Sequence, residues 1–301
     1  MLLECVPNVS LGPQDDALAQ VLADIEAAQG PGCRLLDVHA DRDHRRSVLT
    51  LAGAPAPLLG VVDELAASLE THASLAGHEG VHPRVGLLDV VPFVALDAPR
   101  REAHRVAETA MRRLAGRSVP TYAYAELARR SRTRKLADVR RAFAAAEPGH
   151  PVPLAPDQGP GRLHPRMGAA CVGVRDPLIA YNVVLDTRSL EVGQAIARAI
   201  RASGGGLPGV QALAFGLASR GDRVQVSTNI TDAHATGTTD VLSRVRQEAE
   251  EYGAGVVDGE LVGLAPREGL PKTSSKAGLG TEPVSLEDGL HEAGFSPAEV
   301  C

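Results

Sequence analysis

Aromatic residues and long apolar runs are both scarce in this sequence. It has four Phe, four Tyr and no Trp in 301 residues, although hydrophobic residues make up 44% of the chain. A sizeable core must therefore be built mainly from Ala, Leu and Val. No apolar run approaches the roughly 18 residues of a membrane-spanning helix, and the N-terminal MLLECVPNVS lacks the basic start and apolar stretch of a signal peptide. We expect a cytoplasmic protein without a membrane segment.

Cysteine and excess positive charge are also scarce. The four cysteines (Cys5, Cys33, Cys171 and Cys301) are far apart and form no CxxC pair, which favours reduced thiols over a disulfide framework. The net charge of −6 gives no reason to expect a nucleic-acid partner. One local run is basic, and we interpret it as a solvated helix face. It contains Arg129, Arg130, Arg132, Arg134, Arg140 and Arg141.

Several catalytic motifs are missing as well. The sequence has no P-loop, no GxGxxG after its first strand and no GxSxG. The sequence therefore gives no support for an enzyme with a phosphate-binding loop or for a serine esterase.

The apolar periods predict two units of β-α-β-β-α-β order. The fold class is α/β (α+β), with two ferredoxin-like subdomains over residues 1–175 and 176–301, packed around a ligand groove. The first unit has strands at 2–9, 34–39, 47–52 and 85–96 and helices at 15–28 and 57–75, followed by helices at 99–115 and 132–146 and a short strand near Thr121. The second has strands at 178–185, 210–218, 224–230 and 255–264 and helices at 190–202 and 235–252.

Two irregular stretches interrupt this order. Residues 148–168 hold many prolines and glycines together with Asp157, Arg162, His164 and Arg166. A linker is the simplest interpretation, but long structureless segments in compact proteins are often functional, and we favour a binding loop. Residues 267–282 are rich in Ser, Lys and Gly and are predicted to be a mobile surface loop.

The segment HEGVHPR, residues 78–84, combines two histidines, a carboxylate and an arginine. Its HEGVH matches the HExxH signature of zinc peptidases, which needs one continuous helix through both histidines. Pro83 follows His82 directly and disfavours a helix there, and Gly77 and Gly80 weaken one further. We instead predict a helix ending near Gly77, a tight loop, a strand from Val85 and no metal. A zinc peptidase remains an alternative.

In a βαββαβ sheet this loop and the charged turn after Asp37 can lie over one face. Histidine suits proton transfer in both directions near neutral pH, and arginine binds carboxylates through its rigid fork. The group predicts a substrate with carboxylates and a reaction that moves protons, although a histidine before proline can simply cap a turn. Its members are Asp37, Asp43, His44, Arg46, His82 and Arg84.

The sequence resembles the glutamate formimidoyltransferase (formiminotransferase) family. The resemblance covers nearly the whole chain, with its motifs in family order. They are ECVPNVS, LLDVHADRDHRRSVLT, GHEGVHPRVGLLDVVPF, APDQGP, LIAYNVVL, QVSTNITD, LVGLAP and, faintly, GFSP.

The resemblance implies an enzyme that transfers a formimino group from N-formimino-L-glutamate to N5 of tetrahydrofolate, in histidine degradation. It implies His82 as the catalytic base, and Asp37, Asp43, Arg46 and Arg84 as candidates for binding the donor. Tetrahydrofolate is the co-substrate, no metal is needed, and a homodimer is expected. The implied folate-contacting segment consists of Gly159, Pro160, Gly161, Arg162, Leu163, His164, Pro165, Arg166, Met167 and Gly168.

Four positions depart from the family's usual residues. Arg45 stands where Asn is usual, His39 where an acidic residue is frequent, Gln158 where an aromatic is usual, and Val184 where a second Asn is usual. Two further alternatives therefore stay open. One is transfer from another donor, such as formiminoglycine, and the other is a folate-binding relative without turnover.

Overall fold

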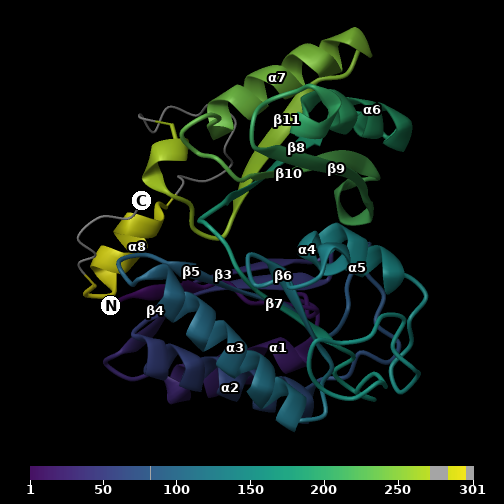
Figure 1. The fold of residues 1–301 in the computed structure, drawn as a ribbon. Coiled ribbons are helices and arrows are strands. Elements are labelled where there is room, and N and C mark those ends of the chain that lie inside the picture. The colour runs from purple at the N-terminus through teal and green to yellow at the C-terminus, as the bar shows by residue number, and fades with distance from the viewer. Residues whose placement is uncertain (82, 272–283, 296–301) are drawn as a thin grey trace. The chain divides into compact units, whose positions relative to one another are not determined.

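The computed structural model describes residues 1–81, 83–271 and 284–295. They form two compact units, residues 1–175 and 176–295, each built around its own sheet (Figure 1). We describe each unit by itself.

The first unit contains a seven-stranded sheet of order β1-β4-β2-β5-β7-β6, with β3 paired to β4. Most pairs are antiparallel, but β5, β7 and β6 run parallel. The predicted β-α-β-β-α-β order is confirmed. Its elements are β1 (Leu3–Cys5), β2 (Asn8–Val9), α1 (Asp16–Ala28), β3 (Cys33–Asp41), β4 (Arg46–Gly53), α2 (Pro55–His72), β5 (Leu88–Ala95), α3 (Arg100–Gly116), β6 (Thr121–Ala125), α4 (Ser131–Arg134), α5 (Leu136–Ala142) and β7 (Ala170–Val174).

Helices α1, α2 and α3 cover one face of this sheet (Figure 1). Side chains along a strand point to alternate faces, so Leu49 and Leu51 of β4 lie on the same face. They pack with Leu58 and Leu65 of α2 in a core of aliphatic side chains. On the other face a smaller cluster includes Tyr122 and Phe143, whose rings meet edge to face at 5.3 Å between centroids. The sheet therefore has one aliphatic face and one face that is partly polar.

The second unit repeats the order around a four-stranded antiparallel sheet, β11-β8-β10-β9. Helices α6 and α7 cover one face, over Tyr181, Val183 and Val226 (Figure 1). This βαββαβ prediction is also confirmed. The elements are β8 (Ile179–Leu185), α6 (Leu190–Ile200), β9 (Val210–Leu217), β10 (Arg223–Ile230), α7 (Thr238–Glu251), β11 (Val256–Val262) and α8 (Leu286–Glu292), with 3₁₀ turns at Ala202–Gly204, Ala218–Arg220 and Arg267–Gly269.

Some predicted elements were wrong in detail. The first strand is two short strands, because Pro7 lacks the N–H that a continuous ladder requires. The helix over 132–146 is two short helices, separated at Lys135 by extended backbone. Strand β7 and helix α8 were not predicted. The loop predicted at 267–282 begins with a 3₁₀ turn at Arg267–Gly269, and its residues 272–282 lie outside the described ranges.

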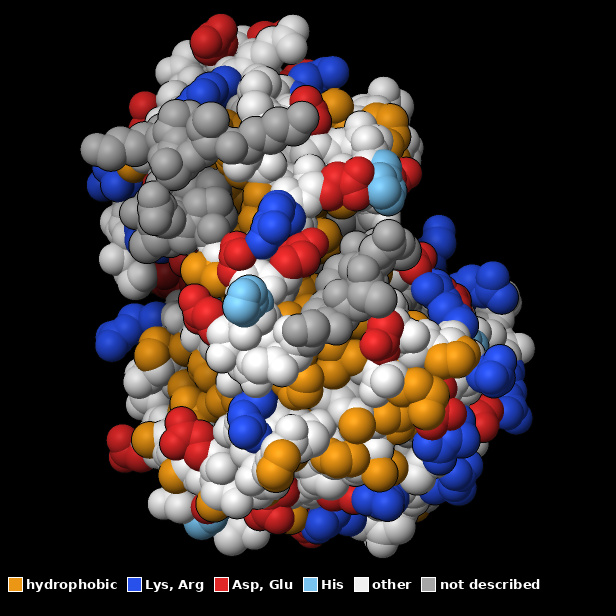
Figure 2. All heavy atoms as spheres, turned by 90° about the vertical axis from the view of Figure 1, so that its left-hand side faces the viewer, with side chains coloured by type: hydrophobic (Ala, Val, Ile, Leu, Met, Phe, Trp, Pro, Cys, Tyr) orange, Lys and Arg blue, Asp and Glu red, His pale blue; other side chains and the backbone are white. Residues whose placement is uncertain are grey.

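The surface carries charges of both signs. Figure 2 shows one face of the molecule, on which acidic and basic side chains are interspersed with apolar ones. Cys5, Cys33 and Cys171 are free thiols, and all three are buried. In the described ranges, every helix is too short or too polar to span a bilayer.

Candidate functional site

The segment after α2 is an irregular loop rather than a helix. Helix α2 ends at His72, earlier than predicted, and residues 78–81 and 83–84 are not helical. The helix that a zinc-peptidase signature requires is therefore not formed over the described part of HEGVH. Strand β5 begins at Leu88, three residues later than predicted. His82 lies outside the described residues.

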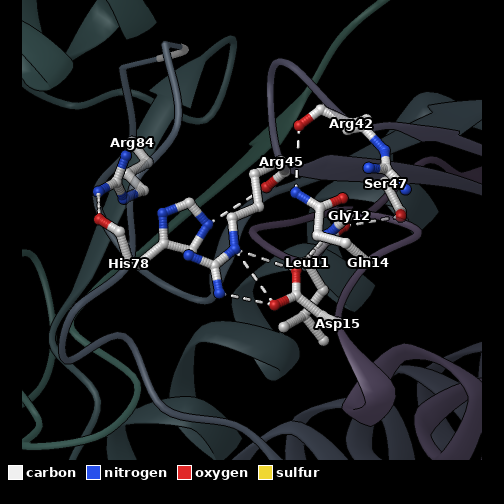
Figure 3. Close-up of polar contacts among 9 residues, drawn as sticks. All are labelled: Leu11, Gly12, Gln14, Asp15, Arg42, Arg45, Ser47, His78 and Arg84. Atoms are coloured by element: carbon white, nitrogen blue, oxygen red, sulfur yellow. Dashed lines mark hydrogen bonds and ion pairs between the residues drawn. The ribbon is translucent and has the colours of Figure 1, made fainter. Parts of the chain in front are cut away.

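His78 and Arg84 hold this loop together (Figure 3). The ring nitrogen Nε2 of His78 lies 3.2 Å from the backbone oxygen of Arg45, and Arg84 donates to the backbone oxygens of His78 and Gly80. The N–H of Val81 donates to the backbone oxygen of Asp43 at 3.4 Å. The loop is thereby fastened to the β3–β4 turn. Burial and the positive charges of Arg84 and Arg45 lower the pKa of His78.

Arg45 has a backbone φ of +45°, in the left-handed region that few side chains adopt. Asn tolerates this region better than Arg, which gives a physical reason for the Asn that is usual here. In this chain the Arg45 guanidinium donates from Nε and Nη2 to the carboxylate of Asp15, and the shortest of these hydrogen bonds is 2.7 Å (Figure 3). This pair helps to offset the backbone strain and fixes the turn that carries Asp43 and His44.

A buried carboxylate, Asp89 on β5, joins three parts of the first unit. Its Oδ1 accepts from the Val85 N–H at 2.7 Å. Its Oδ2 lies 3.4 Å from Arg46 Nη2 on β4 and also accepts from Arg140 Nη2 on α5. Only 1% of the Asp89 side chain is exposed, against 13% for Arg46 and 14% for Arg140. The interpretation of the arginine run as a solvated face was therefore wrong for Arg140.

Arg46 is held in an environment that disfavours its charge. Its Nε donates to Asn8 Oδ1 at 3.0 Å. Burial and the nearby charge of Arg140 lower its pKa to about 9, outweighing the opposing effects of Asp89 and Tyr124. A guanidinium with this pKa nevertheless stays protonated near neutral pH, so Arg46 is a buried cation.

Asp37 lies on the polar face of β3, in register with Thr50 of β4, whereas Arg46 is in register with Asp41. Thr50 and Arg46 are four positions apart along β4, or roughly 13 Å. Burial raises the pKa of Asp37, and the charge of His39 offsets this only in part. At the far end Asp41 accepts from the ring and the backbone N–H of His44, at 2.8 and 2.6 Å.

The end of the segment predicted to contact folate pairs with residues 85–87. Ala169 N donates to the Val85 oxygen at 3.0 Å, and Leu87 N to the Met167 oxygen at 2.9 Å. Gly86 and Gly168 form a bridge, and a Cβ on Gly86 would lie 1.9 Å from the Ala169 oxygen. Residues 167–169 therefore lie beside residues 85–87, immediately after the His-Pro-Arg motif.

Two side chains of this segment bond to backbone groups. His164 Nδ1 accepts from the Met167 N–H at 3.0 Å, so its proton is on Nε2, which lies 3.6 Å from Glu70. Arg166 donates to the backbone oxygens of Thr71 and Ala73, at 3.0 and 2.8 Å, and so caps the C-terminal end of α2. Leu163 and Met167 are buried, while Gly159, Pro160, Gly161, Arg162 and Pro165 are exposed.

The sequence identified part of this arrangement. Arg46 and Arg84 both lie near Asp89, since Arg84 is close enough for that carboxylate to act on its charge. Asp43 contacts the loop through its backbone. Among the described residues no hydrogen bond or ion pair joins Asp37 to Arg46 or Arg84. Asp89 and Arg140 were missed, although a carboxylate in the apolar run LLDVVPF was a usable signal.

Two of the departing positions differ in surroundings. Gln158 lines a surface pocket of about 180 Å³ with Met111 and Leu127, and its backbone oxygen accepts from Thr121 at 2.9 Å. Val184 is buried in β8, in register with Gln225 of β10. The Gln225 side chain is 1% exposed, and neither atom of its amide has a partner in the described ranges.

Comparison with known proteins identifies the same family across both units. Residues 2–175 match the formiminotransferase domain, N-terminal subdomain, and residues 180–275 match the formiminotransferase domain. The chain is 33% identical to glutamate formimidoyltransferase of Streptococcus pyogenes serotype M1, over 89% of this chain and 90% of that protein. It is 37% identical to glutamate formimidoyltransferase of Thermoplasma acidophilum, over 89% of each.

A longer relative matches over about half its length. The chain is 35% identical to formimidoyltransferase-cyclodeaminase of Sus scrofa, over 89% of this chain and 51% of that protein.

Proposed function

The chain belongs to the formiminotransferase family, and from that premise we propose that it transfers a formimino group from N-formimino-L-glutamate to N5 of tetrahydrofolate. The products are 5-formiminotetrahydrofolate and glutamate. The observation that supports this most directly is the pairing of residues 167–169 with residues 85–87. This pairing joins the strand entry after the His-Pro-Arg motif to the proposed folate segment, Gly159 to Gly168.

The proposed mechanism is a proton-coupled acyl-type transfer. The N5 lone pair attacks the formimino carbon and a tetrahedral intermediate forms. His82 accepts the N5 proton and returns it to the glutamate nitrogen, which leaves as the carbon–nitrogen bond breaks. Arg46 and Arg84 bind the donor's carboxylates. Asp37 or Asp43 binds the positively charged formimino group, and the raised pKa of Asp37 falls when that cation is next to it.

A donor panel tests the proposed function. Purified protein is mixed with tetrahydrofolate and with N-formimino-L-glutamate, formiminoglycine or formiminoaspartate, and the formimino product is followed by absorbance. We expect kcat/KM to be highest for N-formimino-L-glutamate. A higher kcat/KM for formiminoglycine would mean that formiminoglycine, and not N-formimino-L-glutamate, is the donor. Folate binding without turnover of any donor would support a non-catalytic relative, and loss of activity on chelation would revive a metal-dependent alternative.

Assembly and location are part of the same proposal. We propose a cytoplasmic homodimer, on the strength of the family resemblance. Light scattering of the purified protein measures the mass directly, and a value equal to one 31.4 kDa chain would contradict the dimer.

A further inference from the structure

We propose that Arg140 acts with Arg46 to bind one carboxylate of the formimino donor, and that Asp89 is the positioning residue that aims both guanidinium groups. This inference rests on the proposed function and names a subsite for it. Arg140 comes from α5, far in sequence from the His-Pro-Arg motif at residues 82–84. Three other arginines of the same basic run, Arg129, Arg130 and Arg141, are more exposed.

The charges at this position favour an anion. Arg46 and Arg140 both contact Oδ2 of Asp89, so two guanidinium groups share one carboxylate oxygen. Arg140 is largely buried, and a buried charge is costly unless it is fully compensated. Arg140 Nε is also buried and has no hydrogen-bond partner within the described ranges. A carboxylate with two oxygens can accept from both groups through their planar forks.

The place of this group in the fold connects it with the reaction. Asp89 Oδ1 accepts from the N–H of Val85, the residue that follows His82, Pro83 and Arg84. One side chain therefore links the strand entry after the proposed base to both arginines. The small exposed fraction of Arg46 and Arg140 suits a compact group such as a carboxylate. It is too small for a contact with a whole pterin ring.

The test compares Arg140→Met with Arg141→Met. The two positions are adjacent on α5, but the Arg141 side chain is 77% exposed and pairs only with Asp138 within the described ranges. We expect Arg140→Met to raise KM for N-formimino-L-glutamate at least tenfold and to change KM for tetrahydrofolate less than threefold. Arg141→Met should change neither value by more than twofold. If Arg140→Met instead raises KM for tetrahydrofolate, the assignment is wrong, and the two arginines bind folate and not the donor.

A second measurement separates binding from folding. Donors that lack the α-carboxylate or carry the γ-carboxylate as an amide are compared with N-formimino-L-glutamate in the wild type and in Arg140→Met. The wild type should discriminate against one of the two analogues, and Arg140→Met should lose most of that discrimination. If Arg140→Met lowers kcat/KM equally for all three donors, the arginine is only structural and the proposal fails.

Asp89→Asn tests the positioning role. The amide keeps the shape and can still accept from Val85, but it removes the charge that orients both arginines. We expect a higher donor KM with the pH profile of kcat unchanged; an unchanged donor KM would contradict the role. A wild type inactive with every donor would instead count against the proposed function. Wild-type turnover with Arg140→Met unaffected would count against this inference alone.

Discussion

Arg84, His164 and Arg166 were all expected to contact ligands, and each uses its side chain to hold backbone groups. Arg84 bonds to the loop that precedes it, His164 accepts from Met167, and Arg166 caps α2. Charged residues in irregular segments have this second use, because turns expose carbonyl and N–H groups that need partners. The sequence cannot separate the two uses, so the single-residue tests must measure folding and activity together.

Replacing His82 tests the proposed base. General base catalysis contributes about 10²–10⁴-fold, so His82→Ala should lower kcat by that factor. KM for tetrahydrofolate should stay within a few-fold, since binding rests on other groups. His78→Ala serves as the comparison in steady-state assays. If His78→Ala is inactive while His82→Ala keeps full turnover, the base is another residue.

The buried imidazole of His78 should make stability depend on pH. Its folded pKa is lowered by burial and by Arg84 and Arg45, whereas the unfolded value is about 6.5. Below that value the unfolded chain binds more protons than the folded chain, so stability falls as pH decreases. Thermal melts at pH 7.5 and 5.5 should show a smaller drop for His78→Gln, which can still donate to Arg45, than for the wild type.

The exposed His150 provides the matched control for this measurement. His150→Gln should leave the pH dependence of the melting temperature unchanged. Equal drops in the wild type and in His78→Gln would show that His78 is not the group responsible.

At the scale of elements, the contact between residues 85–87 and 167–169 governs the candidate site. Gly86 permits it, because a Cβ there would lie 1.9 Å from one backbone oxygen and 2.4 Å from another. Gly86→Ala must move one segment, and we expect a loss of about 2–4 kcal/mol in unfolding free energy. Gly60→Ala in α2 is the control, since nothing lies within 4 Å, and it should stabilise by about 0.5–1 kcal/mol. Denaturant melts that rank the two variants in the opposite order would contradict this picture.

The same segment should respond to folate. If Gly159 to Gly168 contacts tetrahydrofolate, its amides should exchange more slowly with solvent when the folate is bound. The 3₁₀ turn Ala218–Arg220 of the second unit gives the reference for unaffected exchange. Hydrogen exchange followed by mass spectrometry measures both. Equal amide exchange rates in residues 159–168 with and without folate would mean that this segment is a structural loop that does not contact folate.

At the scale of the whole molecule, each unit has its own sheet and its own buried clusters. A unit with a closed core should fold alone. We therefore predict that residues 1–175, expressed separately, unfold cooperatively on heating and keep their near-ultraviolet circular dichroism. A fragment with helical far-ultraviolet signal but no cooperative transition would show that the boundary at 175 is not a folding boundary.

The sequence by itself determined the order of elements in both units. Apolar residues recur with the periods of helices and strands, and that local signal specifies βαββαβ twice. It missed the five-residue strand β7 (Ala170–Val174), ACVGV. This strand follows a stretch without an apolar period and is fixed only by its parallel pairing with β5 and β6. It also joined α4 and α5, because the break at Lys135 depends on backbone angles and on no Pro or Gly.

The motif and the segment of the candidate site were likewise visible in the sequence. Their contact was decided by tertiary structure. Residues 85–87 and 167–169 are about eighty positions apart and are joined by backbone hydrogen bonds, which depend little on side-chain type. Asp89 brings Arg46 and Arg140 together from two further elements, although Arg140 and Arg141 look alike in sequence. Only the packing of α5, with Val139 buried, decides which of them turns inward.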